Sequence, residues 1–337
     1  MKPDRARNAG RRATMDELVG ELRQAVDGLA ADGIDRGDIK ILLRAVRELR
    51  YSFKVFAGLK SYRKVTVFGS ARCAAGSPTY LQAVAFGKEM ARRGWMVVTG
   101  AGEGIMEAAH VGAGPELAIG INILLPFEQA DNPVIAGSDK LIHVKYFFTR
   151  KLLFIKETDG VALFPGGFGT LDEAFEILTL LQTGKSRIFP VVLVDAPGGD
   201  YWRIWRSFVE RHLLARKWLS PEDLSFFRIT DSAEEAAAEI LGFYRVFHSM
   251  RTVGPELVIR LRRPLSKNEL QGLKERFGDI LSGGTFLGCA ALPGEEDEPE
   301  LAALPRLAFR FNRRSYGRLR MLIDALNREE AGRDGQT

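Results

Sequence analysis

The stretch Val161-Ala-Leu-Phe-Pro-Gly-Gly-Phe-Gly-Thr-Leu-Asp-Glu173 combines a short apolar run, a glycine-rich turn and the start of a helical pattern. The run from Val161 to Phe164 is apolar throughout, as expected for a strand whose sheet is covered by helices on both faces. Three glycines between Gly166 and Gly169 let the backbone approach a ligand closely. This order of strand, loop and helix predicts an α/β fold with a ligand site at the loop.

Apolar runs and helical patterns alternate on both sides of this stretch. Short runs predicted to be strands lie at 64–69, 95–100, 117–124, 140–144, 160–164 and 188–194. Helices are expected at 78–93, 103–113, 147–157, 170–183, 200–214 and 233–247. The alternation predicts a doubly wound, Rossmann-like parallel sheet.

Two further patterns flank this α/β core. Before it, apolar residues recur at helical spacing and predict a helical leader, with a break between Gly33 and Gly37. After it, the order βαββα predicts a small α+β domain, either a ligand sensor or an oligomer surface. The expected divisions are a basic tail at 1–14, the leader at 15–62, the Rossmann-like domain at 63–250, the α+β domain at 254–328 and a tail at 329–337.

Composition excludes several classes of protein. The longest apolar runs are far shorter than the roughly 20 residues that a membrane span needs, so no membrane partner is expected. The basic N-terminus MKPDRARNAGRR lacks the apolar stretch of a secretory signal, and a cytoplasmic protein is expected. The basic residues are scattered and interleaved with 43 acidic residues, so the net charge of +5 does not indicate a nucleic-acid partner.

The sequence also gives little support to metal or cofactor chemistry. Cys73 and Cys289 stand far apart, and the four histidines show no metal-ligand spacing. The loop from Thr99 to Met106 is similar to a dinucleotide fingerprint, but Ile105 replaces its third glycine and no acidic residue follows about 20 residues later. Neither a metal nor a cofactor is expected.

Glycine-rich loops follow three of the predicted strands, where open α/β sheets bind their ligands. The loop from Gly166 to Thr170 opens a helix, so its N–H groups and the helix dipole favour an anion such as a phosphate. The alternative is structural, because Thr170 and Glu173 also match a capping box that would only fix the helix start. The candidate binding residues of the three loops are Ser70, Arg72, Gly102, Gly104, Gly166, Gly167, Gly169 and Thr170.

Two cations, Arg150 and Lys151, stand at the start of the helix expected at 147–157. That end of a helix already carries a positive dipole, so a nearby ligand anion would explain the pair. A solvated pair of side chains is the alternative.

Together these residues resemble the LONELY GUY (LOG) family, formerly called lysine decarboxylase-like, whose mark is P-G-G-x-G-T-x-x-E. The mark is complete from Pro165 to Glu173, and Arg150-Lys151 matches the family's Arg-Lys element. The strand with Gly69-Ser70 and the glycine loop before Gly104-Ile-Met106 also match. The resemblance covers about residues 63–195.

The resemblance implies a phosphoribohydrolase that splits a nucleoside 5′-monophosphate into free base and ribose 5-phosphate without a cofactor. The substrate would be AMP-like or a cytokinin riboside 5′-monophosphate, the latter giving a role in cytokinin activation. Glu173 and Arg150 would be catalytic, and the loop Gly166–Thr170 would bind the phosphate with Lys151 contributing charge. Asp172 and Glu176 would assist them. A homodimer or larger homo-oligomer is implied.

This chain departs from a minimal family member in its leader, its α+β domain and Phe168, where tyrosine is frequent. A non-catalytic carrier of a phosphorylated ligand, similar to molybdenum-cofactor carriers, is the main alternative. Arg150 and Glu173 argue against it, because a pure anion carrier gains little from a buried glutamate. Lysine decarboxylation is disfavoured, since no lysine has the Schiff-base setting that pyridoxal phosphate requires.

Overall fold

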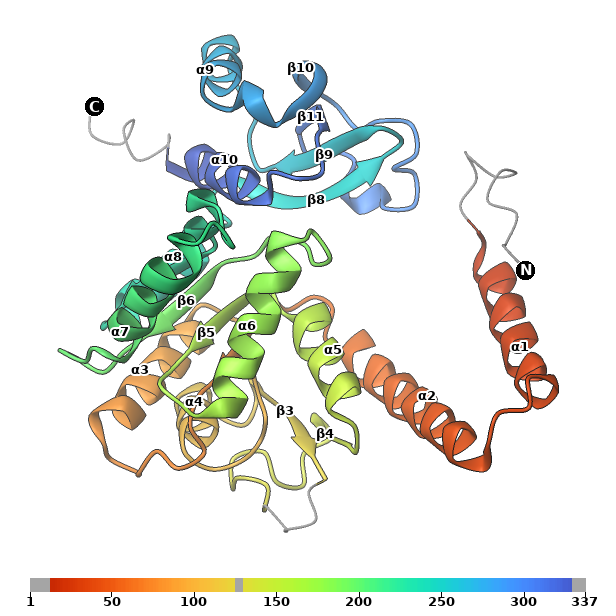
Figure 1. Cartoon of the computed structure of the whole chain (residues 1–337), viewed down its shortest axis with the longest axis vertical. Coiled ribbons are helices and arrows are strands. Elements are labelled where there is room, and N and C mark those ends of the chain that lie inside the picture. Colours follow the sequence, from red (N-terminus) through yellow and green to blue (C-terminus); the bar gives the residue numbers. More distant parts are fainter. Residues whose placement is uncertain (1–12, 125–129, 329–337) are drawn as a thin grey trace. The chain divides into compact units, whose positions relative to one another are not determined.

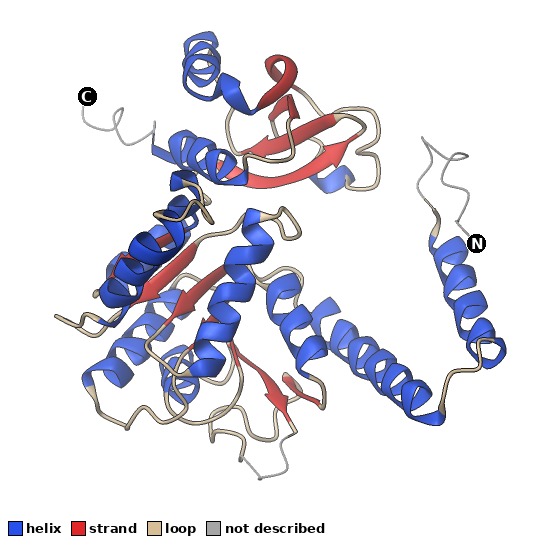
Figure 2. Cartoon of the chain, in the orientation of Figure 1, coloured by secondary structure: helices blue, strands red, loops and turns tan. Residues whose placement is uncertain are grey.

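The computed structural model describes residues 13–124 and 130–328, which divide into two compact units with the boundary between Tyr51 and Ser52 (Figures 1 and 2). Most of the expected basic tail at 1–14 and the tail at 329–337 lie outside the described residues. The first unit holds α1 (Met15–Ala31) and most of α2 (Arg36–Ala57). A capping box between Thr14 and Glu17 begins α1, and Gly33, with φ of 67°, lies between the helices. The predicted helical leader is confirmed.

The second unit contains a seven-stranded sheet in which every pairing is parallel. Its order is β4-β3-β2-β1-β5-β6-β7. The strands are β1 (Lys64–Phe68), β2 (Met96–Thr99), β3 (Ala118–Ile123), β4 (Leu141–Val144), β5 (Gly160–Leu163), β6 (Val191–Val194) and β7 (Phe227–Thr230). The first six were predicted, and five of them, all but β4, are buried along their whole length, as expected for strands covered on both faces.

Helices cover both faces of this sheet, as a doubly wound fold requires (Figure 1). On one face, α3 (Pro78–Arg92) packs against α4 (Ile105–Ala113) and α8 (Ala233–Gly242). On the other, α5 (Phe147–Glu157) and α6 (Phe168–Gln182) lie side by side, joined by Lys151 and Asp172. α7 (Tyr201–Phe208) continues into a π-helical turn, Val209–Leu214, and a 3-10 turn follows at Pro221–Phe226. The predicted fold class is confirmed.

A second, antiparallel sheet of four strands follows, in the order β10-β11-β9-β8. Its strands are β8 (Phe247–Val253), β9 (Glu256–Leu261), β10 (Leu281–Cys289) and β11 (Arg306–Phe311), with helices α9 (Lys267–Phe277) and α10 (Tyr316–Arg328). From β9 to α10 the order is the predicted βαββα. β8 adds a fourth strand beside β9, so the sheet has the strand order of a ferredoxin-like unit whose last strand comes first in the chain.

The helix expected at 233–247 is shorter in the structure. It ends at Gly242, and the chain turns before β8 begins at Phe247. Phe243, Tyr244 and Phe247 continue a helical apolar spacing, but their rings pack against one another from a turn and a strand. The helical periodicity therefore comes from an aromatic cluster, and strand pairing of Phe247 with Leu261 overrides it.

α10 joins the second sheet to the parallel core. The fully buried Arg320 donates hydrogen bonds to Glu239 of α8 at 2.9 Å and to Asp324 at 2.8 Å. The Asn327 side chain accepts hydrogen bonds from the backbone N–H groups of Val246 and Phe247. Through these bonds, α10 contacts both the end of α8 and the start of β8.

The acidic turn at 294–300 is also anchored to the second sheet. The Glu295 carboxylate lies between the guanidinium groups of Arg260 and Arg306, at 2.8 Å and 3.3 Å. The three side chains are only 3%, 1% and 1% exposed for Arg260, Glu295 and Arg306. Removing Glu295 would leave the buried Arg306 without its carboxylate partner, while Arg260 keeps Glu298 at 2.7 Å.

We expect Glu295→Ala to lower the free energy of unfolding by about 3–5 kcal/mol, as found when one partner of a buried ion pair is removed. Glu300→Ala, an exposed position of the same turn, is the matched control and should change it little. Denaturant unfolding measures both variants. Equal stability of the two would show that the buried cluster contributes nothing.

Candidate active site

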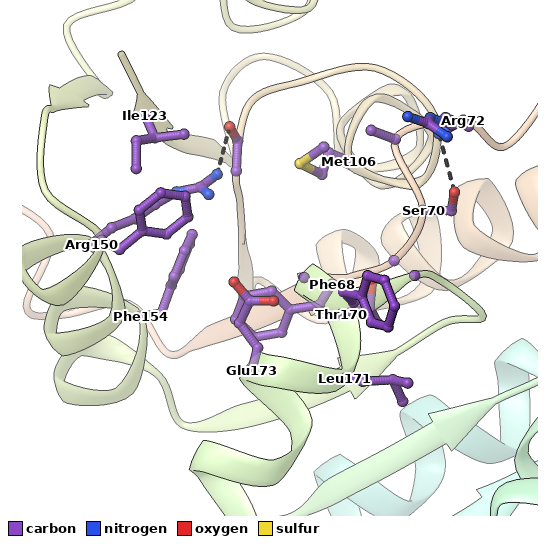
Figure 3. Close-up of a pocket in the computed structure, with 17 residues that line it drawn as sticks. Phe68, Ser70, Arg72, Met106, Ile123, Arg150, Phe154, Thr170, Leu171 and Glu173 are labelled. Atoms are coloured by element: carbon purple, nitrogen blue, oxygen red, sulfur yellow. Dashed lines mark hydrogen bonds between the residues drawn. The ribbon is translucent and has the colours of Figure 1, made fainter. Parts of the chain in front are cut away.

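The site lies where the carboxyl ends of β2, β1 and β5 meet, since these strands are neighbours in the sheet. The chain order reverses beside β1, and ligands bind at such switch points. A cavity of about 640 Å³ opens there (Figure 3). Its lining comes from the loops after β1, β2 and β5, from α5 and from the start of α6.

The third loop leads directly into α6, which begins at Phe168, two residues earlier than predicted. Its N-cap is Gly167, and no side chain makes a capping hydrogen bond there. The capping box between Thr170 and Glu173, the structural alternative, is therefore not formed. The first N–H groups of a helix have no intrahelical partner, so this helix start offers donors and positive dipole to the cavity.

The glycines of the loops fall into two groups. At Gly100, Gly104 and Gly166 the protein itself forbids a side chain, because an added Cβ would lie 2.1 Å from Arg150 Nη2, 2.4 Å from the Ser70 carbonyl oxygen and 2.1 Å from Thr170 Oγ1. At Gly167 a Cβ would meet nothing within 4 Å, and at Gly169 only Glu173 Oε2 at 3.9 Å. The second group leaves open space beside the helix start, where a ligand can approach the backbone.

Arg150 extends from α5 and is held by two backbone carbonyls. Its Nε donates to Ile121 O at 2.9 Å and its Nη2 to Gly100 O at 3.2 Å. The guanidinium also lies over the Phe154 ring, 5.2 Å from its centre. Burial lowers the pKa of Arg150 to about 10, against the opposing field of Glu173, so the group stays charged at neutral pH.

Glu173 lies in the second turn of α6, with its carboxylate directed into the cavity (Figure 3). Burial raises its pKa to about 7, while the nearby charges of Arg150 and Lys151 act in the opposite direction. A carboxyl group that titrates near neutral pH in a cleft is typical of acid–base chemistry.

Lys151 occupies a different place from Arg150. Its ammonium binds Asp172 at 2.7 Å and Glu176 at 2.8 Å, both on α6, and it is not among the residues that line the cavity. The two cations at the start of α5 therefore have protein partners, carbonyls for Arg150 and carboxylates for Lys151. A ligand anion is not needed to explain them.

The other predicted residues also divide by position. Ser70, Arg72, Gly167, Gly169 and Thr170 line the cavity with Arg150 and Glu173. Ser70 Oγ accepts a hydrogen bond from Arg72 N at 3.1 Å (Figure 3). Gly102, Gly104 and Gly166 are not among the residues that line the cavity.

Sequence reasoning missed the apolar wall of the cavity and one residue that supports the third loop. The wall is formed by Phe68, Met106, Ile123, Phe147, Phe154, Phe168 and Leu171. Tyr201, at the start of α7, donates its hydroxyl hydrogen to Gly166 O at 2.6 Å. Its position after β6, another carboxyl end of the sheet, is the signal that could have found it.

Within residues 13–124 and 130–328 there is no group of three or more His, Cys, Asp or Glu side chains able to hold a metal ion. None of the helices in these ranges is long and apolar enough to cross a membrane.

The model of the family described as "Possible lysine decarboxylase" matches residues 103–240. The cytokinin riboside 5′-monophosphate phosphoribohydrolase of Mycobacterium tuberculosis is 30% identical over 174 residues, covering 49% of this chain and 88% of that protein. The pyrimidine/purine nucleotide 5′-monophosphate nucleosidase of Escherichia coli K12 is 29% identical over 144 residues, covering 39% of this chain and 31% of that protein. Among solved structures, the molybdenum cofactor carrier protein of Chlamydomonas reinhardtii is 21% identical with a TM-score of 0.36, covering 52% of this chain and 94% of that one.

Replacing a glycine with alanine should have opposite effects on stability and ligand binding in the two groups of glycines. Gly169→Ala should leave stability unchanged or raise it by up to about 1 kcal/mol, since alanine favours helix more than glycine does. If a phosphate binds at the helix start, the methyl group would occupy part of its space and break hydrogen bonds worth about 1.5–3 kcal/mol. Binding of a nucleotide probe such as AMP should then weaken about tenfold or more.

Gly166→Ala is the matched comparison and should lower the unfolding temperature, because its Cβ would collide with Thr170 Oγ1. Thermal unfolding and calorimetric titration with AMP measure both variants. Unchanged AMP binding in Gly169→Ala would refute the assignment of a ligand to the helix start.

Proposed function

Since this chain belongs to the LONELY GUY (LOG) family, we propose that it hydrolyses the N-glycosidic bond of a nucleoside 5′-monophosphate. The observation that carries the proposal is that Arg150 and a Glu173 of raised pKa line one cavity, beside an uncapped helix start. The products would be the free base and ribose 5-phosphate.

The cavity suggests how such a substrate would bind. The 5′-phosphate would accept hydrogen bonds from the N–H groups at the start of α6 and from the Thr170 hydroxyl. The ribose would then lie beside Glu173, about one helical turn further along α6. The base would contact the apolar wall, in which Phe68 and Phe147 offer aromatic surface.

The chemistry follows from charge development at the sugar. As the bond from C1′ to the base nitrogen breaks, its electron pair leaves with the base and the ribose acquires oxocarbenium character. The Glu173 carboxylate would stabilise this positive charge and accept a proton from the water that attacks C1′. The departing base takes up a proton from solvent, which balances the reaction.

Arg150 would orient the ribose hydroxyls and hold Glu173 in its ionised form. The guanidinium is already fixed by two carbonyls, so little reorganisation is needed when substrate binds. Phosphate binding at the helix start would supply binding energy from a part of the substrate that does not react.

A non-catalytic carrier of a phosphorylated ligand is the second candidate. Carrier function requires the helix start but gives no use to a desolvated Glu173, whose negative charge would repel a bound phosphate. This repulsion is explained if the Glu173 carboxylate acts on the ligand, so hydrolysis is the better supported function.

Within the proposal, the substrate is AMP-like or a cytokinin riboside 5′-monophosphate, in a cytoplasmic homodimer or larger homo-oligomer. Exposed apolar side chains of α5 beside the cavity, Phe147, Phe148 and Leu152, support an assembly that covers them. Light scattering on the purified chain tests the assembly, and a monomer would remove this part of the proposal.

The first experiment is to incubate the chain with AMP, GMP, CMP, UMP and a cytokinin nucleotide and to measure free base by chromatography. We expect base release from at least one nucleotide, reduced about 100-fold or more in Glu173→Ala, as for loss of a general base. Release of no base by a protein that binds AMP would establish the carrier instead.

The pH dependence of kcat/KM is expected to show a limb set by Glu173. Because its pKa is raised to about 7, the group is protonated below that pH and ionised above it. A role as carboxylate therefore predicts activity that rises through about pH 7 and then levels off. The limb should be absent from the residual activity of Glu173→Gln, and activity that falls through pH 7 would make Glu173 a proton donor.

A further inference from the structure

A buried set of polar groups holds the loop after β2 in place through hydrogen bonds. Asn132 donates its backbone N–H to Ala101 O at 2.8 Å and its side-chain Nδ2 to Gly102 O at 3.2 Å. Thr99 Oγ1 accepts from Ala101 N at 3.0 Å. Ala101 has φ of 61°, which few residues other than glycine adopt, so these bonds hold the loop in a conformation it would not otherwise prefer.

His110 of α4 completes the set. Its Nε2 lies 3.1 Å from Ile119 O, which can only accept, so Nε2 carries the proton and Nδ1 accepts from Asn132 Nδ2 at 3.2 Å. Burial lowers the pKa of His110 to about 4, so the ring is neutral in this one tautomer at physiological pH.

The orientation of the Asn132 amide is thereby fixed. Turning it over would place Oδ1 against two acceptors, Gly102 O and His110 Nδ1. In the observed orientation Oδ1 is buried without a hydrogen-bond partner among the described residues. A buried oxygen without a partner destabilises the fold. We infer that the two hydrogen bonds donated by Asn132 Nδ2 offset this cost.

This loop is in direct contact with Arg150. Gly100 O accepts the hydrogen bond from Arg150 Nη2, and the space of a Gly100 Cβ is occupied by the same nitrogen. A shift of the loop would therefore displace the guanidinium. Its other carbonyl partner, Ile121 O, lies on β3 and cannot compensate for that loss.

We propose that His110 and Asn132 are positioning residues, which act through the Gly100–Gly102 loop to hold Arg150 in its place beside Glu173. The inference rests on the proposed function for its kinetic consequences. Neither side chain lines the cavity, so neither needs to touch the substrate.

The kinetic test uses Asn132→Ala and His110→Leu, with the nucleotide that the enzyme cleaves best. We expect kcat to fall about 100-fold, as for misplacement of a catalytic group, with little change in KM. His110→Gln, whose amide can donate to Ile119 O, should recover part of the loss. In an Arg150→Met background, Asn132→Ala should cause no further loss, since the two changes remove the same interaction.

A second readout does not depend on turnover. The charged groups that act on Glu173 are Arg150, Lys151 and Asp172, and Arg150 lowers its pKa most. If Arg150 moves away in Asn132→Ala, the pKa of Glu173 should rise above 7, which carboxyl carbon NMR measures, with Glu173→Gln identifying the signal.

Thr158→Val is the matched control, because Thr158 is a fully buried hydroxyl at the opposite end of β5 whose loss should destabilise the fold without moving this pKa. A Glu173 pKa that is unchanged in Asn132→Ala, or losses that add to those of Arg150→Met, would overturn the proposal. If the wild-type chain cleaves no nucleotide, the proposed function fails, while the NMR measurement still decides whether the two residues position Arg150.

Discussion

The site depends above all on how closely three loops pack at the carboxyl ends of β2, β1 and β5. The backbone of Ser70 is bonded on both sides, since its N–H donates to Pro165 O and its carbonyl accepts from Ile105 N. Gly104 makes one approach possible, because a Cβ there would lie 2.4 Å from Ser70 O of the neighbouring loop. A Cβ at Gly166 would collide with Thr170 Oγ1 of its own loop and lie 3.0 Å from Ser70 N. The three loops therefore share one packing arrangement, which sets the spacing between the helix start and Arg150.

Within that frame, burial and charge oppose each other at Glu173. Burial disfavours the carboxylate and Arg150 favours it, and the balance places the pKa at about 7. Lys151 contributes in a second way, because its single positive charge is shared between Asp172 and Glu176 on the same helix. One of these two negative charges is thus balanced, and Glu173 is the acidic side chain that lines the cavity.

Much of the fold could be predicted because its signals are local. The apolar runs gave six of the seven strands of the parallel sheet, and α5 has the predicted bounds Phe147–Glu157. β7 was missed because Phe227-Arg-Ile-Thr230 lies at the sheet edge and is partly exposed, so it carries no continuous apolar run. β8 was missed because the aromatic cluster of Phe243, Tyr244 and Phe247 imitates helical spacing. In both cases tertiary packing, which a local pattern does not contain, decided the outcome.

The residues of the candidate site likewise divide into those that a local pattern predicts and those that only tertiary contacts reveal. Residues expected to meet the ligand, such as Glu173 and Thr170, are found from sequence because one loop and one helix turn require particular side chains at fixed spacing. Tyr201, His110 and Asn132 instead bind backbone carbonyls of distant segments. Any residue supplies a carbonyl, so only one partner of each such bond leaves a trace in the sequence. The supports of the site therefore become visible only when the loops are seen in place.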